Sequence, residues 1–295
     1  MKSNKYEIEA LPNEHCKTGE NPLWDVGKSL LYWEDIPNGY VFRYNPATGA
    51  HEKIYDGDLV GGFTFQEDGT LLLFRDGNFG ELNNDGSVSV LCNEIEPAVG
   101  RFNDVQADPE GRVYAGTSTD GPSLKGGLLR VDTDGKVTKL FDGTGCSNGM
   151  GFTPDLKQMY WTDSTARAIY IFDYDRATGE LANRRTFYQC EDKLACPDGM
   201  TVDIEGCVWS AHWDGYAVHR FDPQGKLMES INFPVAKVSS VTFGGENLDV
   251  LYMTTAGGTA EKGKGFGKNT EDGTLYRVRV GVKGMPEFRS KIQVA

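Results

Sequence analysis

The phrase Asp198-Gly199-Met200-Thr201-Val202 shows the pattern that organises the chain: two small or polar residues, then an apolar, a variable and an apolar residue. Six copies of this pattern occur, and the first residues of successive copies are 41 to 50 residues apart. The copies are residues 20–24, 61–65, 103–107, 148–152, 198–202 and 239–243. Such regular recurrence predicts a repeat architecture, in which each copy begins one structural unit.

Short aromatic and β-branched runs follow the copies, and because they are too short for helices they suit strands. The predicted second strands are residues 30–33, 71–74, 113–115, 159–161, 208–209 and 250–253. Third strands are predicted at residues 40–44, 127–131, 168–172, 217–221 and 274–278, and more polar fourth strands at 51–55, 137–141 and 183–188. No helical stretch longer than a turn or two is recognisable.

Four antiparallel strands in a unit of just over forty residues are typical of a β-propeller blade. The sequence therefore predicts an all-β fold, a single six-bladed β-propeller domain over residues 1–295 with four-stranded antiparallel blades around a central channel. Two separate β-sandwiches would not explain one phrase repeated six times. The last unit lacks a fourth strand after Val280, and residues 5–10 could supply it, which would close the ring and remove an open sheet edge.

Composition and charge exclude several classes of protein. The 295 residues contain 30 Lys and Arg against 43 Asp and Glu, a formal net charge of −13, so neither nucleic acid nor an anionic membrane is expected as a partner. No apolar run could span a bilayer, and the N-terminus lacks the apolar core of a secretion signal. The six cysteines include no CxxC pair and are interpreted as free thiols of a cytoplasmic protein, with a Cys190–Cys196 disulfide disfavoured. The quaternary state expected is a monomer or weak homo-oligomer.

The first residue of each copy should lie at the start of the innermost strand, where the strands of all blades approach the axis. These residues are Glu20, Gly61, Asn103, Asn148, Asp198 and Ser239. Two carboxylates buried at one point are costly unless a cation lies between them. Glu20, Asn148 and Asp198 would offer three oxygens and two negative charges to a divalent ion. The alternative is a polar, water-filled channel in which these residues serve only turns.

Several motifs resemble those of the senescence-marker-protein/gluconolactonase family, which includes regucalcin and bacterial sugar lactonases. The motifs are residues 19–24, 101–104, 147–149, 160–164 and 197–200, with further similarity at 172–185 and 282–284. The resemblance covers nearly the whole chain. It implies a six-bladed propeller, in agreement with the repeat.

The resemblance also implies roles for individual residues. It places the metal ligands at Glu20, Asn148 and Asp198, and a residue that contacts both metal and substrate at Asn103. Arg101 matches an arginine that binds substrate oxygens, and Asp120 is the candidate for an acidic residue that faces the sugar. The all-oxygen ligand set favours a hard cation, with Ca²⁺ preferred and Mg²⁺, Mn²⁺, Zn²⁺ or Fe²⁺ as alternatives.

The activity that the resemblance implies is that of a gluconolactonase-type lactone hydrolase, which opens a sugar lactone to the aldonic acid. Asp198 would act as the general base, or else would only position a water activated by the ion. Two alternatives are an organophosphate or aryl-ester hydrolase on the same propeller, and a non-catalytic calcium-binding propeller. Arg101 and Asp120 favour a small polyhydroxylated substrate over an apolar ester.

One further segment has an unusual composition. Residues 257–268 are rich in glycine and lysine and should form a loop between the second and third strands of the last unit. This loop is interpreted either as a lid over the channel or a site for an acidic ligand, or as a solvated loop without a role in binding.

Overall fold

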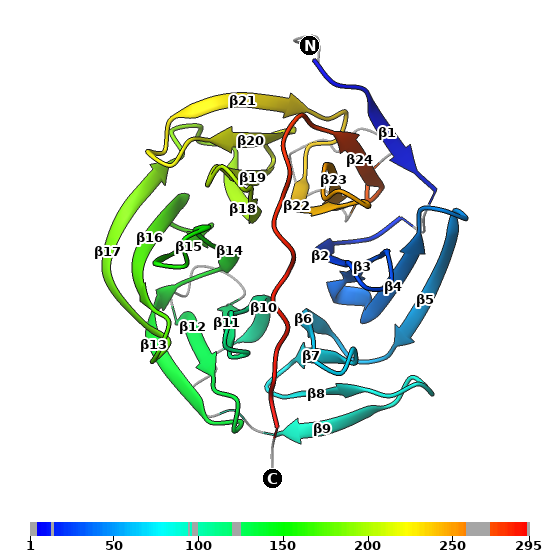
Figure 1. The fold of residues 1–295 in the computed structure, drawn as a ribbon, viewed down its shortest axis with the longest axis vertical. Coiled ribbons are helices and arrows are strands. Elements are labelled where there is room, and N and C mark those ends of the chain that lie inside the picture. The colour runs from blue at the N-terminus through cyan, green and yellow to red at the C-terminus, as the bar shows by residue number, and fades with distance from the viewer. Residues whose placement is uncertain are drawn as a thin grey trace.

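The protein is a closed ring of β-sheets (Figure 1). The computed structural model describes residues 5–12, 15–93, 95, 100–119, 125–257 and 272–293. Within these residues, six antiparallel sheets of four strands each surround a central channel. The prediction of an all-β, six-bladed propeller is confirmed. The 3₁₀ turn η1 (Ile36–Asn38) is the one helical element in the described part of the chain, and no helix there is long and apolar enough to cross a membrane.

Blades are numbered in chain order, and the strands of each are given from the channel outward. Blade 1 contains β2 (Gly19–Asp25), β3 (Leu30–Asp35), β4 (Tyr40–Asn45) and β5 (Ala50–Asp56). Blade 2 contains β6 (Val60–Phe65), β7 (Leu71–Arg75), β8 (Phe79–Leu82) and β9 (Val88–Cys92). Blade 3 contains β10 (Arg101–Ala107), β11 (Val113–Ser118), β12 (Gly126–Val131) and β13 (Val137–Thr144).

The second half of the ring repeats this order. Blade 4 contains β14 (Ser147–Phe152), β15 (Gln158–Asp163), β16 (Ala168–Asp175) and β17 (Glu180–Gln189). Blade 5 contains β18 (Cys196–Val202), β19 (Val208–Trp213), β20 (Ala217–Phe221) and β21 (Leu227–Asn232). Blade 6 contains β22 (Val238–Gly244), β23 (Val250–Thr255), β24 (Leu275–Arg279) and β1 (Ile8–Leu11). The predicted strands all recur here, and β8, β9 and β21 are additions that the sequence patterns did not reveal.

The ring closes through the N-terminal strand, as predicted. Strand β1 pairs antiparallel with β24, with Ile8 opposite Val278 and Leu11 opposite Leu275. The outer edge of blade 6 is thus formed by the first strand of the chain, so the two ends of the repeat array hold each other.

The core lies between neighbouring blades and is rich in aromatic side chains. Trp33, Trp161 and Trp209 occupy the second strands of blades 1, 4 and 5 and are essentially inaccessible to solvent. Trp33 stacks on Phe42 of the adjacent strand, with ring centroids 5.3 Å apart. Burying one such side chain contributes about 1.5–3 kcal/mol, so these layers account for much of the stability of each blade. All six cysteines are thiols, in agreement with the sequence prediction.

Residues 281–293, called here the C-terminal strap, run across the ring after β24 (Figure 1). The strap contacts the ends of the inner strands, because the Ser290 amide donates to the Phe65 carbonyl (2.8 Å) and the Ile204 amide to the Lys283 carbonyl (3.0 Å). Arg289 of the strap pairs with Asp25 at 2.9 Å. The strap therefore covers the end of the channel at which the inner strands finish.

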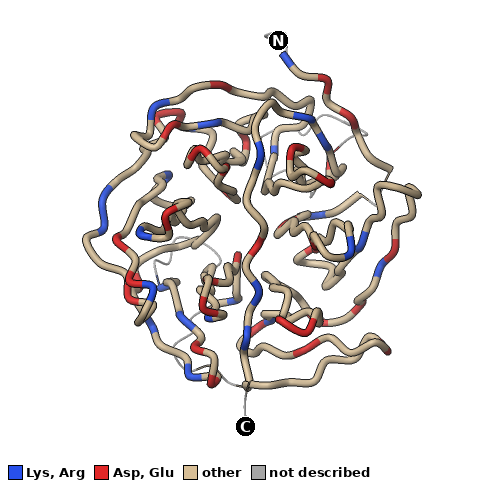
Figure 2. Tube along the Cα trace, viewed as in Figure 1, with Lys and Arg blue, Asp and Glu red and all other residues tan. Residues whose placement is uncertain are grey.

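Acidic and basic residues alternate around the whole ring, and no side of it is exclusively basic (Figure 2). This mixed distribution agrees with the formal net charge of −13.

Candidate active site

A β-bulge interrupts each inner strand at the end of the channel opposite the strap. The pairing register between the first and second strands shifts at Glu20/Leu23, Val60/Gly62, Phe102/Val105, Asn148/Met150, Pro197/Met200 and Val238/Ser240. Asn21 and Asp104, which follow the predicted site residues, have positive φ angles of 49° and 55°. Because bulges redirect side chains, the repeated irregularity explains how the first residue of a unit turns toward the axis.

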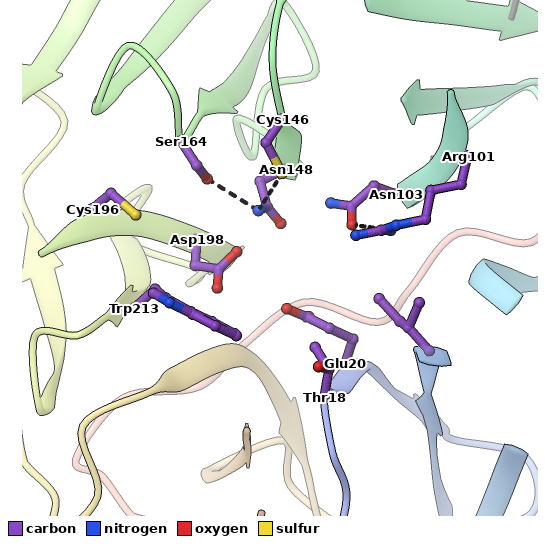
Figure 3. A pocket seen from close by; sticks show the side chains of 11 residues that line it. Thr18, Glu20, Arg101, Asn103, Cys146, Asn148, Ser164, Cys196, Asp198 and Trp213 are labelled. Atoms are coloured by element: carbon purple, nitrogen blue, oxygen red, sulfur yellow. Dashed lines mark hydrogen bonds between the residues drawn. The ribbon is translucent and has the colours of Figure 1, made fainter. Parts of the chain in front are cut away.

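Of the six residues that were predicted to converge, four line one cavity, and Gly61 and Ser239 are not among its lining residues. Glu20, Asn103, Asn148 and Asp198 come from blades 1, 3, 4 and 5 and line one cavity of about 270 Å³. Figure 3 shows their side chains directed toward a common centre. Each is only 3% to 7% exposed. Gly149 permits this convergence, because a Cβ there would lie 2.6 Å from the Asp198 carbonyl oxygen of the next blade.

The two carboxylates of the cavity form no ion pair within the described part of the chain, and the more distant charges of Lys237 and Arg101 offset only part of the rise in the pKa of Asp198. Burial is the main reason why the pKa values of Glu20 and Asp198 lie well above their usual range, and the negative charge of nearby Asp104 raises both further. Asp198 also raises the pKa of Glu20. Two buried acids that disfavour each other's charge form an environment suited to a bound cation.

The two carboxamides of the cavity differ in how they are used. Asn103 is bonded at both ends, since its Nδ2 donates to the Ser147 carbonyl (2.7 Å) and its Oδ1 accepts from Arg101 Nη1 (2.6 Å). Asn148 donates from Nδ2 to Ser164 Oγ (3.0 Å), but its buried Oδ1 has no hydrogen-bond donor within the described residues. An unpaired buried carbonyl oxygen beside two carboxylates fits a cation ligand. Glu20, Asn148 and Asp198 are thus the residues that could hold a metal ion.

Arg101 lies beside this group, at the edge of the cavity (Figure 3). Its Nη1 donates to the Asn103 side chain and to the Phe102 carbonyl. Within the described residues these are its hydrogen bonds, so Nε and Nη2 have donor capacity for a ligand in the cavity. Arg101 therefore lies at the cavity, and its contact with a substrate stays a prediction.

Six further residues line the cavity, and the sequence analysis assigned none of them a role. They are Thr18, Ile36, Cys146, Ser164, Cys196 and Trp213. The sequence did contain a pattern that could have identified three of them as cavity residues. Thr18, Cys146 and Cys196 each precede the first residue of a repeat by two positions, as Arg101 does. This position lies at or just before the start of the inner strand, and its side chains line the cavity together with the polar group. Burial raises the pKa of Cys146 to about 11 and that of Cys196 to about 12, which makes both thiols poor nucleophiles.

Trp213 supplies an aromatic wall of the cavity, next to Asp198 (Figure 3). It ends β19, and the ammonium of Lys237 lies 4.1 Å from the centroid of its ring. Lys237 in turn pairs with Asp214 at 3.0 Å. The ring is therefore held in place by a cation over one of its faces.

Two predicted features fall outside the residues that the structure describes. Asp120, the candidate for an acidic contact to the sugar, is one of them. The glycine- and lysine-rich segment is the other, since only Gly257 of residues 257–268 is described.

A second acidic group, Asp203, Glu205 and Cys207, has ligand atoms within 4.8 Å of one another. Its charge is already compensated, because Arg220 donates to Asp203 Oδ2 and to Glu205 Oε2, each at 2.7 Å. Asp203 Oδ2 also accepts from Trp209 Nε1. This group is therefore a structural ion-pair cluster, and it does not fit a metal ion as the channel residues do.

Comparison with known proteins identifies similar chains over nearly the full length. The model of the SMP-30/Gluconolactonase/LRE-like region matches residues 18–257. Pentonolactonase XacC of Haloferax volcanii is 43% identical over 283 residues, which cover 95% of this chain and 96% of that protein. Regucalcin of Oryctolagus cuniculus is 34% identical over 292 residues, covering 96% and 97% of the two chains. The solved structure of a luciferin-regenerating enzyme has a TM-score of 0.91 and 29% identity, covering 97% of this chain and all of that one.

Proposed function

Because the chain belongs to the SMP-30/gluconolactonase/LRE-like family, we propose that it is a lactone hydrolase that opens the lactone of a sugar acid to the aldonic acid with a divalent cation in the channel. The lactonase relative, which is 43% identical over 95% of this chain, supports the enzyme class.

One observation of the structure carries the proposal. Glu20, Asn148 and Asp198 bring two carboxylates and one unpaired carbonyl oxygen into the same cavity, and no cationic side chain pairs with them in the described residues. Such a site is costly to fold and is stabilised by a hard divalent ion, with Ca²⁺ our first choice. When bound, the cation supplies Lewis-acid stabilisation of the negative charge that develops on the lactone carbonyl oxygen.

The side chains around the cavity account for the rest of the reaction. Asp198 carries a second carboxylate oxygen, which can accept a proton from the water that attacks the carbonyl carbon. Arg101 can donate hydrogen bonds to hydroxyl or carbonyl oxygens of the lactone, and Asn103 Oδ1 fixes its guanidinium at 2.6 Å. Trp213 offers an apolar surface for the carbon face of a sugar ring. The ester C–O bond then breaks, and the ring oxygen takes up the proton held by Asp198 and leaves as a hydroxyl group.

The preferred substrates within this class are five-carbon aldonolactones, such as xylono- and arabinonolactone, ahead of glucono- and galactonolactone. The name of the pentonolactonase relative supports this order. A cavity of about 270 Å³ is large enough for a single sugar ring.

The test is proton release in a weakly buffered indicator assay with these lactones, after removal of bound metal and after addition of Ca²⁺, Mg²⁺, Mn²⁺ or Zn²⁺. We expect turnover that depends on the ion and disappears in Asp198→Asn. The matched control is Asp142→Asn, a surface carboxylate 64% exposed, which should hydrolyse lactones like the wild type. Absence of turnover above the spontaneous rate in folded, metal-loaded protein would contradict the proposal and would redirect attention to phosphoesters or to a binding role.

A further inference from the structure

The Asn148 side chain can serve a cation only if its amide is oriented correctly. A carboxamide has an acceptor end and a donor end of nearly equal shape, and an amide turned by 180° would present its NH₂ group to the ion. The structure places Oδ1 in the buried, unpaired position and Nδ2 toward Ser164. The residue that fixes this orientation therefore determines whether Asn148 can serve as the third ligand, beside Glu20 and Asp198.

Ser164 follows β15 and lies between the strands that carry two of the proposed ligands. Its hydroxyl donates to the Pro197 carbonyl at 2.8 Å. A carbonyl oxygen can only accept, so the single hydroxyl proton is committed to Pro197. The lone pairs of Ser164 Oγ are then left to accept, and Asn148 Nδ2 donates to them at 3.0 Å. This chain of two hydrogen bonds has one possible direction.

We propose that Ser164 is a positioning residue of the cation site, which orients the Asn148 amide so that Oδ1 faces the ion. The inference builds on the proposed function, since it concerns the same cation. Pro197 immediately precedes Asp198, so the same hydroxyl also connects the strand that bears Asn148 with the strand that bears Asp198. Ser164 acts through other side chains and is not itself a ligand or a catalytic residue.

The other acceptors near Asn148 Nδ2 are less suited than the hydroxyl to fix the amide. Cys146 Sγ lies 3.7 Å from Nδ2, and a sulfur atom is a weak acceptor. The Asp198 carboxylate also accepts a hydrogen bond from the Asn148 side chain, but this carboxylate is itself a proposed ligand of the cation. Removal of the hydroxyl in Ser164→Ala leaves the amide free to turn and also leaves the Pro197 carbonyl without its donor. Loss of a partner that orients a metal ligand commonly costs 10- to 100-fold in metal affinity.

The experiment is calorimetric titration of Ca²⁺, and separately of Mn²⁺, into metal-stripped protein without any lactone. The variants are Ser164→Ala and Ser164→Thr, of which only the second keeps a hydroxyl. The matched control is Ser230→Ala on β21, whose hydroxyl contacts His219 Nδ1 at 2.8 Å in blade 5, outside the residues that line the cavity. The thermal midpoint of each metal-free variant is measured alongside.

We expect Ser164→Ala to weaken ion binding about 10- to 100-fold, while Ser164→Thr and Ser230→Ala stay within about threefold of the wild type. Wild-type affinity in a folded Ser164→Ala protein overturns the inference. So does an equal loss in the Ala and Thr variants, because packing and not the hydroxyl would then be responsible. Should Ser164→Ala fail to fold, Ser164→Cys, which keeps the side-chain volume but not the hydroxyl, must show the loss instead.

The result separates this inference from the proposed function. Ion binding by the wild type that Ser164→Ala leaves unchanged rejects only the positioning role. Failure of the wild type to bind Ca²⁺ or Mn²⁺ rejects the cation site itself, and the positioning role with it. Lactonase activity is not needed for either reading.

Discussion

Buried carboxylates occupy both ends of the channel, but they are compensated in opposite ways. At the end covered by the strap, Asp203 follows β18, and at the open end Asp198 lies near the start of the same strand. Both are at most 3% exposed. Asp203 accepts hydrogen bonds from the amides of Glu205 and Cys207 and from the side chains of Trp209 and Arg220. Asp198 has no ion-pair partner among the described residues.

The same contrast recurs in blade 3. Asp108 follows β10 and pairs with Arg112 (2.6 Å) and Tyr174 (2.9 Å), and near the start of that strand Asn103 replaces a carboxylate. The comparison teaches that burial alone does not mark a functional acid. Asp108 and Asp203 receive a counter-charge and hydrogen bonds from neighbouring residues of the protein itself. They therefore stabilise the turns that follow the inner strands. Glu20 and Asp198 have no directly paired cationic side chain among the described residues, which leaves room for an external cation.

The largest effect expected from this contrast is on catalysis at the open end. Asp198→Asn removes both a negative ligand and the proposed proton acceptor, so kcat/KM for the preferred lactone should fall about 1,000-fold or more. The thermal midpoint of the metal-free protein should not fall, because the substitution removes an uncompensated buried charge. Turnover near the wild-type rate, or clear destabilisation of the metal-free variant, would show that Asp198 is a structural acid like Asp203.

At the strap end the same substitution should affect stability instead. Asp203→Asn leaves the Arg220 guanidinium without its buried counter-ion, and we expect a loss of about 3 kcal/mol in the free energy of unfolding. Turnover per folded molecule should change little, since Asp203 does not line the cavity. Urea denaturation of the metal-free protein measures the first quantity, and the lactone assay at low temperature measures the second. A stable but inactive Asp203→Asn protein would contradict the assignment of Asp203 as a structural acid and of Asp198 as a functional one.

The sequence alone predicted the blades and the residues of the open end of the channel, but not the structural acids at the strap end. The repeated phrase predicted the blades, because each strand is encoded by a local alternation of small, apolar and turn residues. The first position of the phrase predicted the residues of the cavity, since equivalent positions in a closed ring must converge. Asp203 was not recognised as a structural acid, because its partner Arg220 is 17 residues away in sequence and meets it only through strand pairing.

The remaining features depend on contacts that no local pattern encodes. The Ser164 bond to Pro197 joins residues 33 apart in different blades, next to the point where the register of β18 shifts. The path of the strap depends on single bonds such as that of Gln66 Nε2 to the Ile292 carbonyl, between residues 226 apart. Such side-chain geometry follows from tertiary packing, which the sequence patterns do not specify.

A smaller effect is expected from Glu34, which extends the comparison to a third kind of acid. Glu34 lies on β3 opposite Glu20, is fully buried, and neither of its carboxylate oxygens has a hydrogen-bond partner in the described residues. Burial raises its pKa well above 4.5, and Asp104 raises it further. The folded state therefore holds this proton more tightly than the unfolded state, so stability is greatest at low pH and is lost as the pH rises from 4.5 toward the raised value.

Glu34→Gln removes this titration and should flatten that part of the pH dependence. Relative to the wild type, the variant should be more stable at pH 7.5 than at pH 5, by about 1–2 kcal/mol in the free energy of unfolding, since one unit of pKa shift corresponds to about 1.4 kcal/mol. Urea denaturation of both metal-free proteins at the two pH values measures the difference. Parallel pH profiles would mean that Glu34 is ionised in the folded state and has a partner of its own.

The smallest effect concerns Cys146, the weaker of the two acceptors for Asn148 Nδ2. Its sulfur lies 3.7 Å from that nitrogen, whereas Ser164 Oγ lies 3.0 Å away and has its proton committed to Pro197. Cys146→Ala should therefore weaken Ca²⁺ binding less than Ser164→Ala does, as measured by the same calorimetric titration. In the double variant the loss should exceed the sum of the single losses in free energy, because Nδ2 then loses both the hydroxyl and the thiol that hold the amide. A Cys146→Ala loss as large as that of Ser164→Ala would assign the orientation of Asn148 to the thiol instead of the hydroxyl.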